Sequence, residues 1–116
     1  MNKNTVGIHI LAEFRTKKYL EDIKAYTVLI QEIAKRYKVQ IVGSSEFVFD
    51  TNGYTATFLL AESHINVHTW PEYELVHLDL FMCNYQNDNS IKVKKIFAKI
   101  QEFFGPYKTN STVINR

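Results

Sequence analysis

The sequence contains few cysteines, prolines and glycines, the residues that cross-link, kink or loosen a chain. It has one cysteine, two prolines and four glycines in 116 residues. A single cysteine excludes an internal disulfide, and the reducing cytoplasm is therefore the expected location. The prolines and glycines do not gather into a linker, and no low-complexity tract or clear internal repeat is visible.

The chain also has little net charge and no long apolar run. Fourteen basic and twelve acidic side chains leave a formal charge of +2. That value is too small to indicate binding to nucleic acid or to a membrane surface. No apolar run is long enough to span a bilayer, and no signal peptide precedes the first predicted strand. We therefore expect neither a nucleic-acid partner nor a membrane partner.

What the sequence does contain is enough apolar material for one modest core. Hydrophobic residues make up 46% of the chain and aromatic residues 14%. This composition indicates a globular protein, and the length indicates a single domain over residues 1–116.

Hydrophobic periodicity predicts strands that alternate with two amphipathic helices. The first helix is predicted at about residues 17–37, and the second begins after Asn89-Ser90 and stops at Gly105-Pro106. In the second helix, residues 91, 93, 96, 97, 100, 103 and 104 are expected to face the core. Strands are predicted at residues 5–13, 39–49 with a bulge at 43–45, 54–61 after a turn at 50–53, 75–81 and 109–114.

Antiparallel hairpins with two long helices favour an α+β two-layer sandwich, in which both helices cover one face of the sheet. The other face also needs a cover, because Phe47, Phe49, Phe58 and Trp70 are too many large aromatics to place beneath two helices. A second copy of the chain is the simplest cover, which predicts a homodimer.

Residues 60–72 combine one serine, two histidines, two glutamates, a tryptophan and a proline. On a helix, His64 and His68 would share one face as metal ligands. The intervening residues favour a strand, however, and Ile65 stands where the glutamate of a zinc-protease helix is expected. We therefore predict no metal site.

Serine hydrolysis is a second possible chemistry for this stretch. Ser63 would be the nucleophile, His68 or His64 the base, and Asp79 the group that orients the base. The sequence has no Gly-x-Ser-x-Gly elbow and no comparable glycine-rich oxyanion loop, so this hypothesis ranks low.

Two ordered strings resemble a known family. Residues 62–72 read Glu-Ser-His-Ile-Asn-Val-His-Thr-Trp-Pro-Glu, and residues 79–83 read Asp-Leu-Phe-Met-Cys. Together they resemble the self-processing site of the small pyruvoyl-dependent S-adenosylmethionine decarboxylases of bacteria and archaea. The resemblance covers most of the chain from Gly7 onward and is close over residues 62–83.

The resemblance implies a self-cleaving decarboxylase whose cofactor is made from its own chain. The Ser63 hydroxyl attacks the carbonyl of Glu62, and β-elimination then breaks the chain between these two residues. Ser63 becomes a pyruvoyl group, which forms a Schiff base with the substrate and replaces pyridoxal phosphate. The family also implies a homodimer of αββα layers whose active sites draw on both subunits.

By position, the resemblance gives tasks to three further side chains. His68 is the base of processing, and Cys83 is the proton donor in turnover. Thr55 stands where the family has a serine, whose hydroxyl stabilises the tetrahedral intermediate of processing. If the strand of Thr55 paired across a tight turn at Glu62-Ser63, Thr55 would lie opposite Trp70 and diagonal to His68.

The substrate-binding residues that the resemblance implies are Phe49 and Trp70, which would stack on adenine, and Glu72, which would hold the ribose hydroxyls. Departures from the family pattern surround this pocket. They leave two alternatives open. One is the same chemistry on arginine or ornithine, with carboxylates such as Glu46, Asp50 or Glu74 pairing with a basic substrate. The other is an unprocessed relative that acts as a binding or regulatory subunit.

Overall fold

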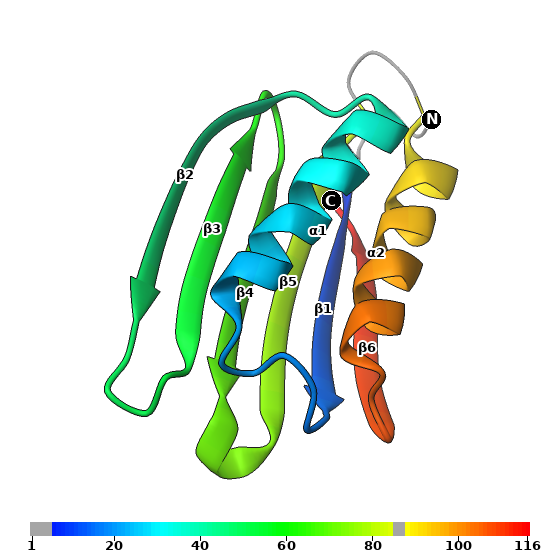
Figure 1. Cartoon of the computed structure of the whole chain (residues 1–116). Helices are drawn as coiled ribbons and strands as arrows, with labels where there is room; N and C mark the ends of the chain where they lie inside the picture. The colour runs from blue at the N-terminus through cyan, green and yellow to red at the C-terminus, as the bar shows by residue number, and fades with distance from the viewer. Residues whose placement is uncertain (1–5, 85–87) are drawn as a thin grey trace.

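Over its described residues, the protein is an antiparallel six-stranded sheet with two helices packed on one face (Figure 1). The computed structural model describes residues 6–84 and 88–116. The strands are β1 (Gly7–Arg15), β2 (Ile41–Val48), β3 (Tyr54–Leu60), β4 (His64–Trp70), β5 (Leu75–Cys83) and β6 (Lys108–Asn115). The helices are α1 (Ile23–Tyr37) and α2 (Ser90–Phe104), and a 3-10 turn, η1 (Pro71–Tyr73), follows β4. The predicted α+β class and helix-covered sheet are confirmed.

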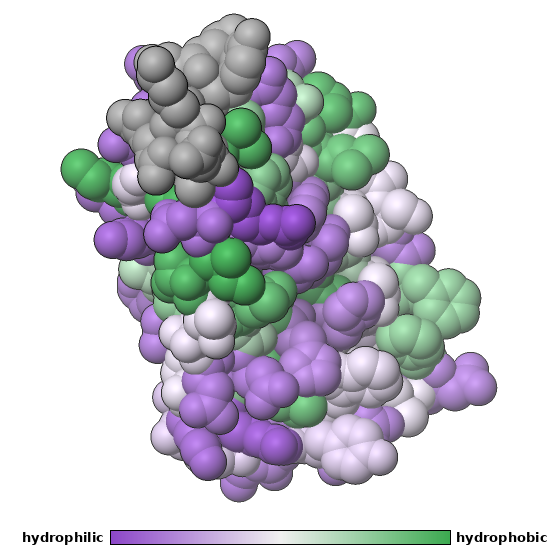
Figure 2. Space-filling model, turned by 180° about the vertical axis from the view of Figure 1, so that it is seen from behind, coloured by the Kyte–Doolittle hydropathy of each residue, from purple (hydrophilic) through white to green (hydrophobic). Residues whose placement is uncertain are grey.

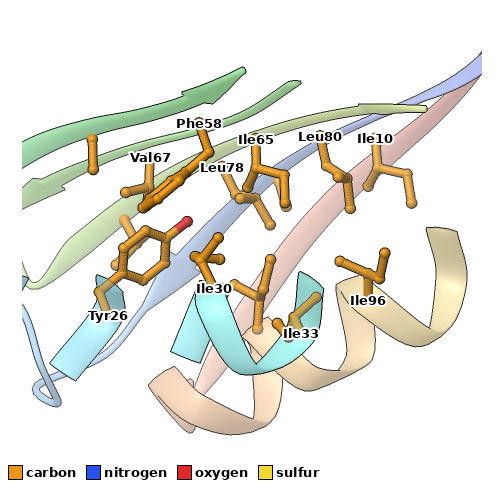
Figure 3. Packing of buried hydrophobic residues seen from close by; sticks show 14 of the residues in the cluster. Ile10, Tyr26, Ile30, Ile33, Phe58, Ile65, Val67, Leu78, Leu80 and Ile96 are labelled. Carbon is orange, nitrogen blue, oxygen red and sulfur yellow. The ribbon is translucent and has the colours of Figure 1, made fainter. Parts of the chain in front are cut away.

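The sheet order is β2-β3-β4-β5-β1-β6, so the first strand lies inside the sheet, between β5 and the last strand. The core fills the space between the sheet and the helices. Figure 3 shows side chains of the strands pointing toward Tyr26 and Ile30 of α1 and Ile96 of α2. These three helix residues are at most 1% exposed. Burial of this apolar surface is the main force that holds the helices on the sheet.

The first helix begins later than its periodicity predicted, at Ile23 instead of residue 17. Asp22 caps it by accepting a hydrogen bond from the Ala25 amide at 3.0 Å. Tyr19, with a φ of 61°, has a left-handed conformation that a helix interior excludes. Leu20 is nevertheless buried. The loop therefore contributes to the core at a spacing that imitates one more helical turn.

The second helix lies where the sequence placed it. It starts after Asn89 and ends at Gly105, whose φ of 52° and hydrogen bond to the Gln101 carbonyl form a left-handed cap. The expectation that Ile91 faces the core is wrong, because this side chain is 72% exposed. The buried stripe runs through residues 93, 96, 100 and 104, and Ile91 lies off that stripe.

The strands differ from their predicted bounds in ways that affect the site. The irregularity in β2 lies between Ile41 and Gly43, one or two residues before the predicted bulge. β5 extends to Cys83 and alternates strictly between buried and half-buried residues, although its sequence alternates less clearly than those of the other predicted strands. β1 runs on to Arg15, while its predicted start at Thr5 lies outside the described residues.

The face of the sheet away from the helices carries all four histidines of the chain: His9, His64, His68 and His77. They alternate along their strands with buried residues of the core. Figure 2 shows the molecule from this side, with apolar patches scattered among polar ones. Among the described residues, no helix is long and apolar enough to cross a membrane.

Candidate functional site

Ser63 lies at the end of a tight turn between β3 and β4. The Leu60 amide donates to the Ser63 carbonyl at 2.9 Å, which leaves Ala61 and Glu62 as the two turn residues. The Ser63 hydroxyl accepts a hydrogen bond of 3.0 Å from the Cys83 amide at the end of β5. The sheet thus brings together two predicted site residues that are far apart in sequence. We call Glu62, Ser63 and Cys83 the serine cluster.

A second group of predicted site residues lies farther along β3 and β4. Thr55 is paired directly with His68, and its hydroxyl lies 2.8 Å from Nδ1 of that imidazole. The expectation that Thr55 faces Trp70 is therefore wrong. The turn is centred on Ala61-Glu62, one residue earlier than assumed, and this shifts the pairing by two residues. The predicted hydrogen-bonding neighbourhood of Thr55 and His68 is present.

The surroundings of His68 favour its neutral form. Partial burial lowers the pKa of His68, the neighbouring His77 lowers it further, and Asp79 opposes both. Burial acts this way because it disfavours the charged imidazolium. At neutral pH the imidazole is therefore unprotonated and able to accept a proton.

The predicted adenine-stacking residues are neighbours at the far end of β4. The rings of Phe49 and Trp70 are 6.2 Å apart at an angle of 15°. Glu72 follows in η1 and is exposed. We call Thr55, His68, Phe49, Trp70 and Glu72 the imidazole cluster.

The two clusters lie at opposite ends of one strand. His68 is five residues from Ser63, which along an extended chain is about 17 Å at roughly 3.4 Å per residue. A base must come within hydrogen-bonding distance of the proton it removes. Within one chain, His68 therefore does not reach Ser63. His64 follows Ser63 directly, and adjacent side chains of an extended segment diverge, which also weighs against a serine-hydrolase triad.

Between the clusters, Asp79 joins two histidines that sequence reasoning did not pair. Its carboxylate is hydrogen-bonded to His9 and, at 3.1 Å, to His64. Burial raises the pKa of Asp79, but the two histidines outweigh it and hold this pKa below the usual value. The ligand atoms of the three residues lie within 4.8 Å of one another, close enough to hold a metal ion. This set does not include His68, so the His64–His68 metal pair considered from sequence has no counterpart here.

His77 also lies on the helix-free face of the sheet and was not predicted as a site residue. It lies opposite His68 on one side and opposite Glu13 on the other. Strand alternation alone places it on the helix-free face, but its neighbours depend on β1 inserting beside β5, which short-range patterns do not reveal.

Comparison with known proteins identifies the class to which this fold and site belong. A solved structure, the crystal structure of the adenosylmethionine decarboxylase from Aquifex aeolicus, superposes with a TM-score of 0.84 at 26% sequence identity, covering 97% of this chain and 91% of that one. The fold is therefore that of a decarboxylase of this type.

Sequence comparison gives the family. Residues 8–116 match the family model described as S-adenosylmethionine decarboxylase. The S-adenosylmethionine decarboxylase proenzyme of Archaeoglobus fulgidus is 37% identical over 113 residues, 96% of this chain and 97% of the relative. The proenzyme of a Sulfurihydrogenibium species is 32% identical over 114 residues, 86% of this chain and 84% of the relative. The chain belongs to the S-adenosylmethionine decarboxylase family, which confirms the resemblance found in its motifs.

Proposed function

We propose that this protein cleaves itself between Glu62 and Ser63 and then converts S-adenosylmethionine to its decarboxylated form, the aminopropyl donor for spermidine. One observation carries the proposal beyond family membership. The Glu62–Ser63 peptide lies in an exposed turn, and the Cys83 amide holds the Ser63 hydroxyl in place at 3.0 Å. The serine is thus fixed at a position where the chain can break without disrupting a strand.

Self-cleavage uses only groups of the chain. The Ser63 oxygen adds to the Glu62 carbonyl carbon, the bond from that carbon to the Ser63 nitrogen breaks, and an ester replaces the peptide. A base then removes the Ser63 α-proton, the Glu62 carboxylate leaves from the β-carbon, and water releases the nitrogen as ammonia. The products are residues 1–62, with an ordinary carboxyl end, and residues 63–116, with a pyruvoyl group. We assign the base to His68 and the supporting hydroxyl to Thr55.

The residues around Ser63 fit a pyruvoyl group. The group supplies an electron-accepting carbonyl that takes the place of a bound cofactor during loss of CO₂. The thiol of Cys83, on the residue whose amide holds Ser63, is assigned the return of a proton to the substrate carbon. Phe49 and Trp70, whose rings are nearly parallel, are assigned to adenine, and Glu72 is assigned to the ribose hydroxyls.

The distance between the clusters supports an active site shared by two subunits. If two copies stack through their helix-free faces about a two-fold axis, the serine cluster of one can meet Thr55 and His68 of the partner subunit. This face exposes apolar side chains suited to such contact: Leu11, Phe47, Leu59 and Ile114. Stacking would produce a homodimer with αββα layers, as the family resemblance implies.

The first test is the mass of the purified, denatured protein after incubation near neutral pH. We expect two fragments, residues 1–62 and 63–116, the second reacting with a carbonyl reagent. The processed protein should release labelled CO₂ from carboxyl-labelled S-adenosylmethionine. Ser63→Ala should remain full length and inactive. Wild-type protein that stays intact, or that is cleaved but inert toward this substrate, would refute the proposal and favour the unprocessed or altered-substrate alternatives.

A second test addresses the shared site. His68→Ala and Ser63→Ala are each expected to stay uncleaved when expressed alone. In co-expressed mixed dimers, the Ser63→Ala chain supplies His68 and the His68→Ala chain supplies Ser63, so the His68→Ala chain should be cleaved. Mixed dimers in which neither chain is cleaved would rule out sharing.

The arginine or ornithine alternative required carboxylates near the substrate. Glu74 is instead engaged by the Tyr107 hydroxyl at 2.9 Å, and Glu46 is paired with Ala56, a core residue on the helix side. These two placements weaken the case for pairing with a basic substrate and leave Asp50 open, and assays with all three substrates will separate the possibilities. The cytoplasmic location expected from the single cysteine stays a prediction.

A further inference from the structure

A series of side-chain contacts links Trp70 to the centre of the sheet. The indole N–H of Trp70 donates to Nδ1 of His77 at 3.2 Å. The two rings also meet edge to face, 6.2 Å apart at 70°. Because the indole N–H can only donate, Nδ1 of His77 is the acceptor, and the imidazole hydrogen lies on Nε2.

The carboxylate of Glu13 lies on the Nε2 side of the same imidazole. A Glu13 carboxylate oxygen lies 3.4 Å from Nε2 of His77, and the two residues are directly paired between β1 and β5. A carboxylate beside Nε2 favours the tautomer with hydrogen on that nitrogen, which leaves the Nδ1 lone pair facing the indole. Neither partner is fully exposed, at 43% for His77 and 51% for Glu13.

Trp70 also stacks on Phe49, whose ring is nearly parallel to the indole. An indole with no polar partner could turn about its side-chain torsions and break this stack. The hydrogen bond to His77 restricts that rotation, because each alternative rotamer leaves the indole N–H without its acceptor.

We infer that His77, oriented by Glu13, is a positioning residue that holds Trp70 in the rotamer needed to stack the aromatic base of the substrate. The inference rests on the proposed function, since it presumes that Phe49 and Trp70 bind that base. It assigns His77 no contact with the reacting atoms. Its loss should therefore weaken substrate binding while leaving the chemical step intact.

The test compares His77→Leu, which removes the acceptor, with His77→Gln, whose side-chain oxygen can still accept from the indole. For His77→Leu we expect the KM for S-adenosylmethionine to rise about fivefold with kcat within about twofold, the size of effect that one lost hydrogen bond produces. His77→Gln should lie near wild type. Glu13→Gln should raise KM less than His77→Leu does, because the acceptor remains and only its orientation is weakened.

Trp70 is the only tryptophan in the sequence, so tryptophan fluorescence reports on this side chain alone. Time-resolved anisotropy should show faster local rotation of the indole in His77→Leu and wild-type behaviour in His77→Gln. Asn110→Leu is the matched control, because Asn110 lies beyond Glu13 on the same face and should change neither KM nor anisotropy.

The outcomes separate this inference from the proposed function. If wild-type protein turns over its substrate and His77→Leu has unchanged KM and unchanged anisotropy, the positioning role is wrong. If KM and kcat change together in both His77 variants, His77 is structural and the inference also fails. If wild-type protein neither cleaves itself nor decarboxylates S-adenosylmethionine, the proposed function fails, whereas the anisotropy still tests the contact between His77 and Trp70.

Discussion

Thr55 differs from the serine that the family resemblance leads one to expect, yet it keeps the functional atom. Its hydroxyl lies 2.8 Å from Nδ1 of His68, so the added methyl group does not prevent this contact. The two residues therefore remain candidates for a pair that acts on the turn of a partner subunit.

Replacing Thr55 by valine removes the hydroxyl and nearly preserves the volume. We expect Thr55→Val to slow self-cleavage by about 10²-fold, the usual cost of losing one donor to a developing oxyanion. Thr55→Ser should cleave at least as fast as wild type. The measurement is the rate of fragment formation by mass spectrometry. Thr57→Val, on the same face of β3, is the control, and equal rates in both valine variants would remove Thr55 from the mechanism.

The rate of self-cleavage at low pH should depend on the protonation state of His68. Only the neutral imidazole can remove the Ser63 α-proton, and burial holds the pKa of His68 below its usual value. The cleavage rate should therefore stay constant as pH falls from 8 toward 7 and decline only below about 6.5. The same shift lowers stability in acid, because the unfolded chain takes up the proton more readily than the folded one. A rate that already falls above pH 7 would contradict this assignment.

At the scale of single elements, the centre of the turn between β3 and β4 determines the partners of the site residues. The sequence supplied the two strands and the serine between them, but not whether Ala61-Glu62 or Glu62-Ser63 formed the turn. Apolar residues could not resolve this, because both turns keep the same side chains on the same face. The observed hydrogen bond from Leu60 to Ser63 decides it and places Thr55 beside His68.

Helix α1 contains a buried polar atom that lowers the stability of the folded protein. The Tyr26 hydroxyl is buried without a hydrogen-bond partner among the described residues. An unpaired buried hydroxyl costs free energy, so Tyr26→Phe should stabilise the protein by about 1 kcal/mol. For a chain of this length, that corresponds to an increase in Tm of about 4 °C.

Tyr54 supplies the matched comparison for this substitution. Its hydroxyl donates to the Tyr19 carbonyl at 3.0 Å, so Tyr54→Phe should instead lower stability by about 1 kcal/mol. Both values come from calorimetry or urea titration. A destabilising Tyr26→Phe would mean that the hydroxyl has a partner in solution, such as a buried water.

At the scale of the whole molecule, the sheet has one face beneath helices and one face open. The homodimer predicted from the aromatic residues concerned this second face. Phe58 is a core residue whose ring centroid lies 6.4 Å from that of Tyr26. Phe47, in contrast, is 62% exposed on the open side. The open face thus retains apolar surface, and the separated clusters add a functional reason for a partner.

A charge on this face should disrupt assembly and processing together. Leu59→Asp introduces a carboxylate at an exposed position of β3 and should convert dimers to monomers in analytical ultracentrifugation, because burying an unpaired charge is costly. Cleavage should slow more than about tenfold, since the base then lacks its partner. Val28→Asp, equally exposed on α1, should change neither property. A monomeric Leu59→Asp protein that cleaves normally would show that one chain suffices.

The sequence by itself determined the class of fold, the two helices, the strand character of residues 64–70 and the residues around Ser63. Those features follow from local periodicity, capping residues and an ordered motif, all of which are contained in short stretches of chain. Tertiary structure alone decided that Thr55 faces His68, that Asp79 links His9 with His64, and that His77 supports Trp70. Each of these contacts depends on strand register or on the insertion of β1 between β5 and β6. Register and strand order are set by the packing of the whole core, which no local pattern of residues specifies.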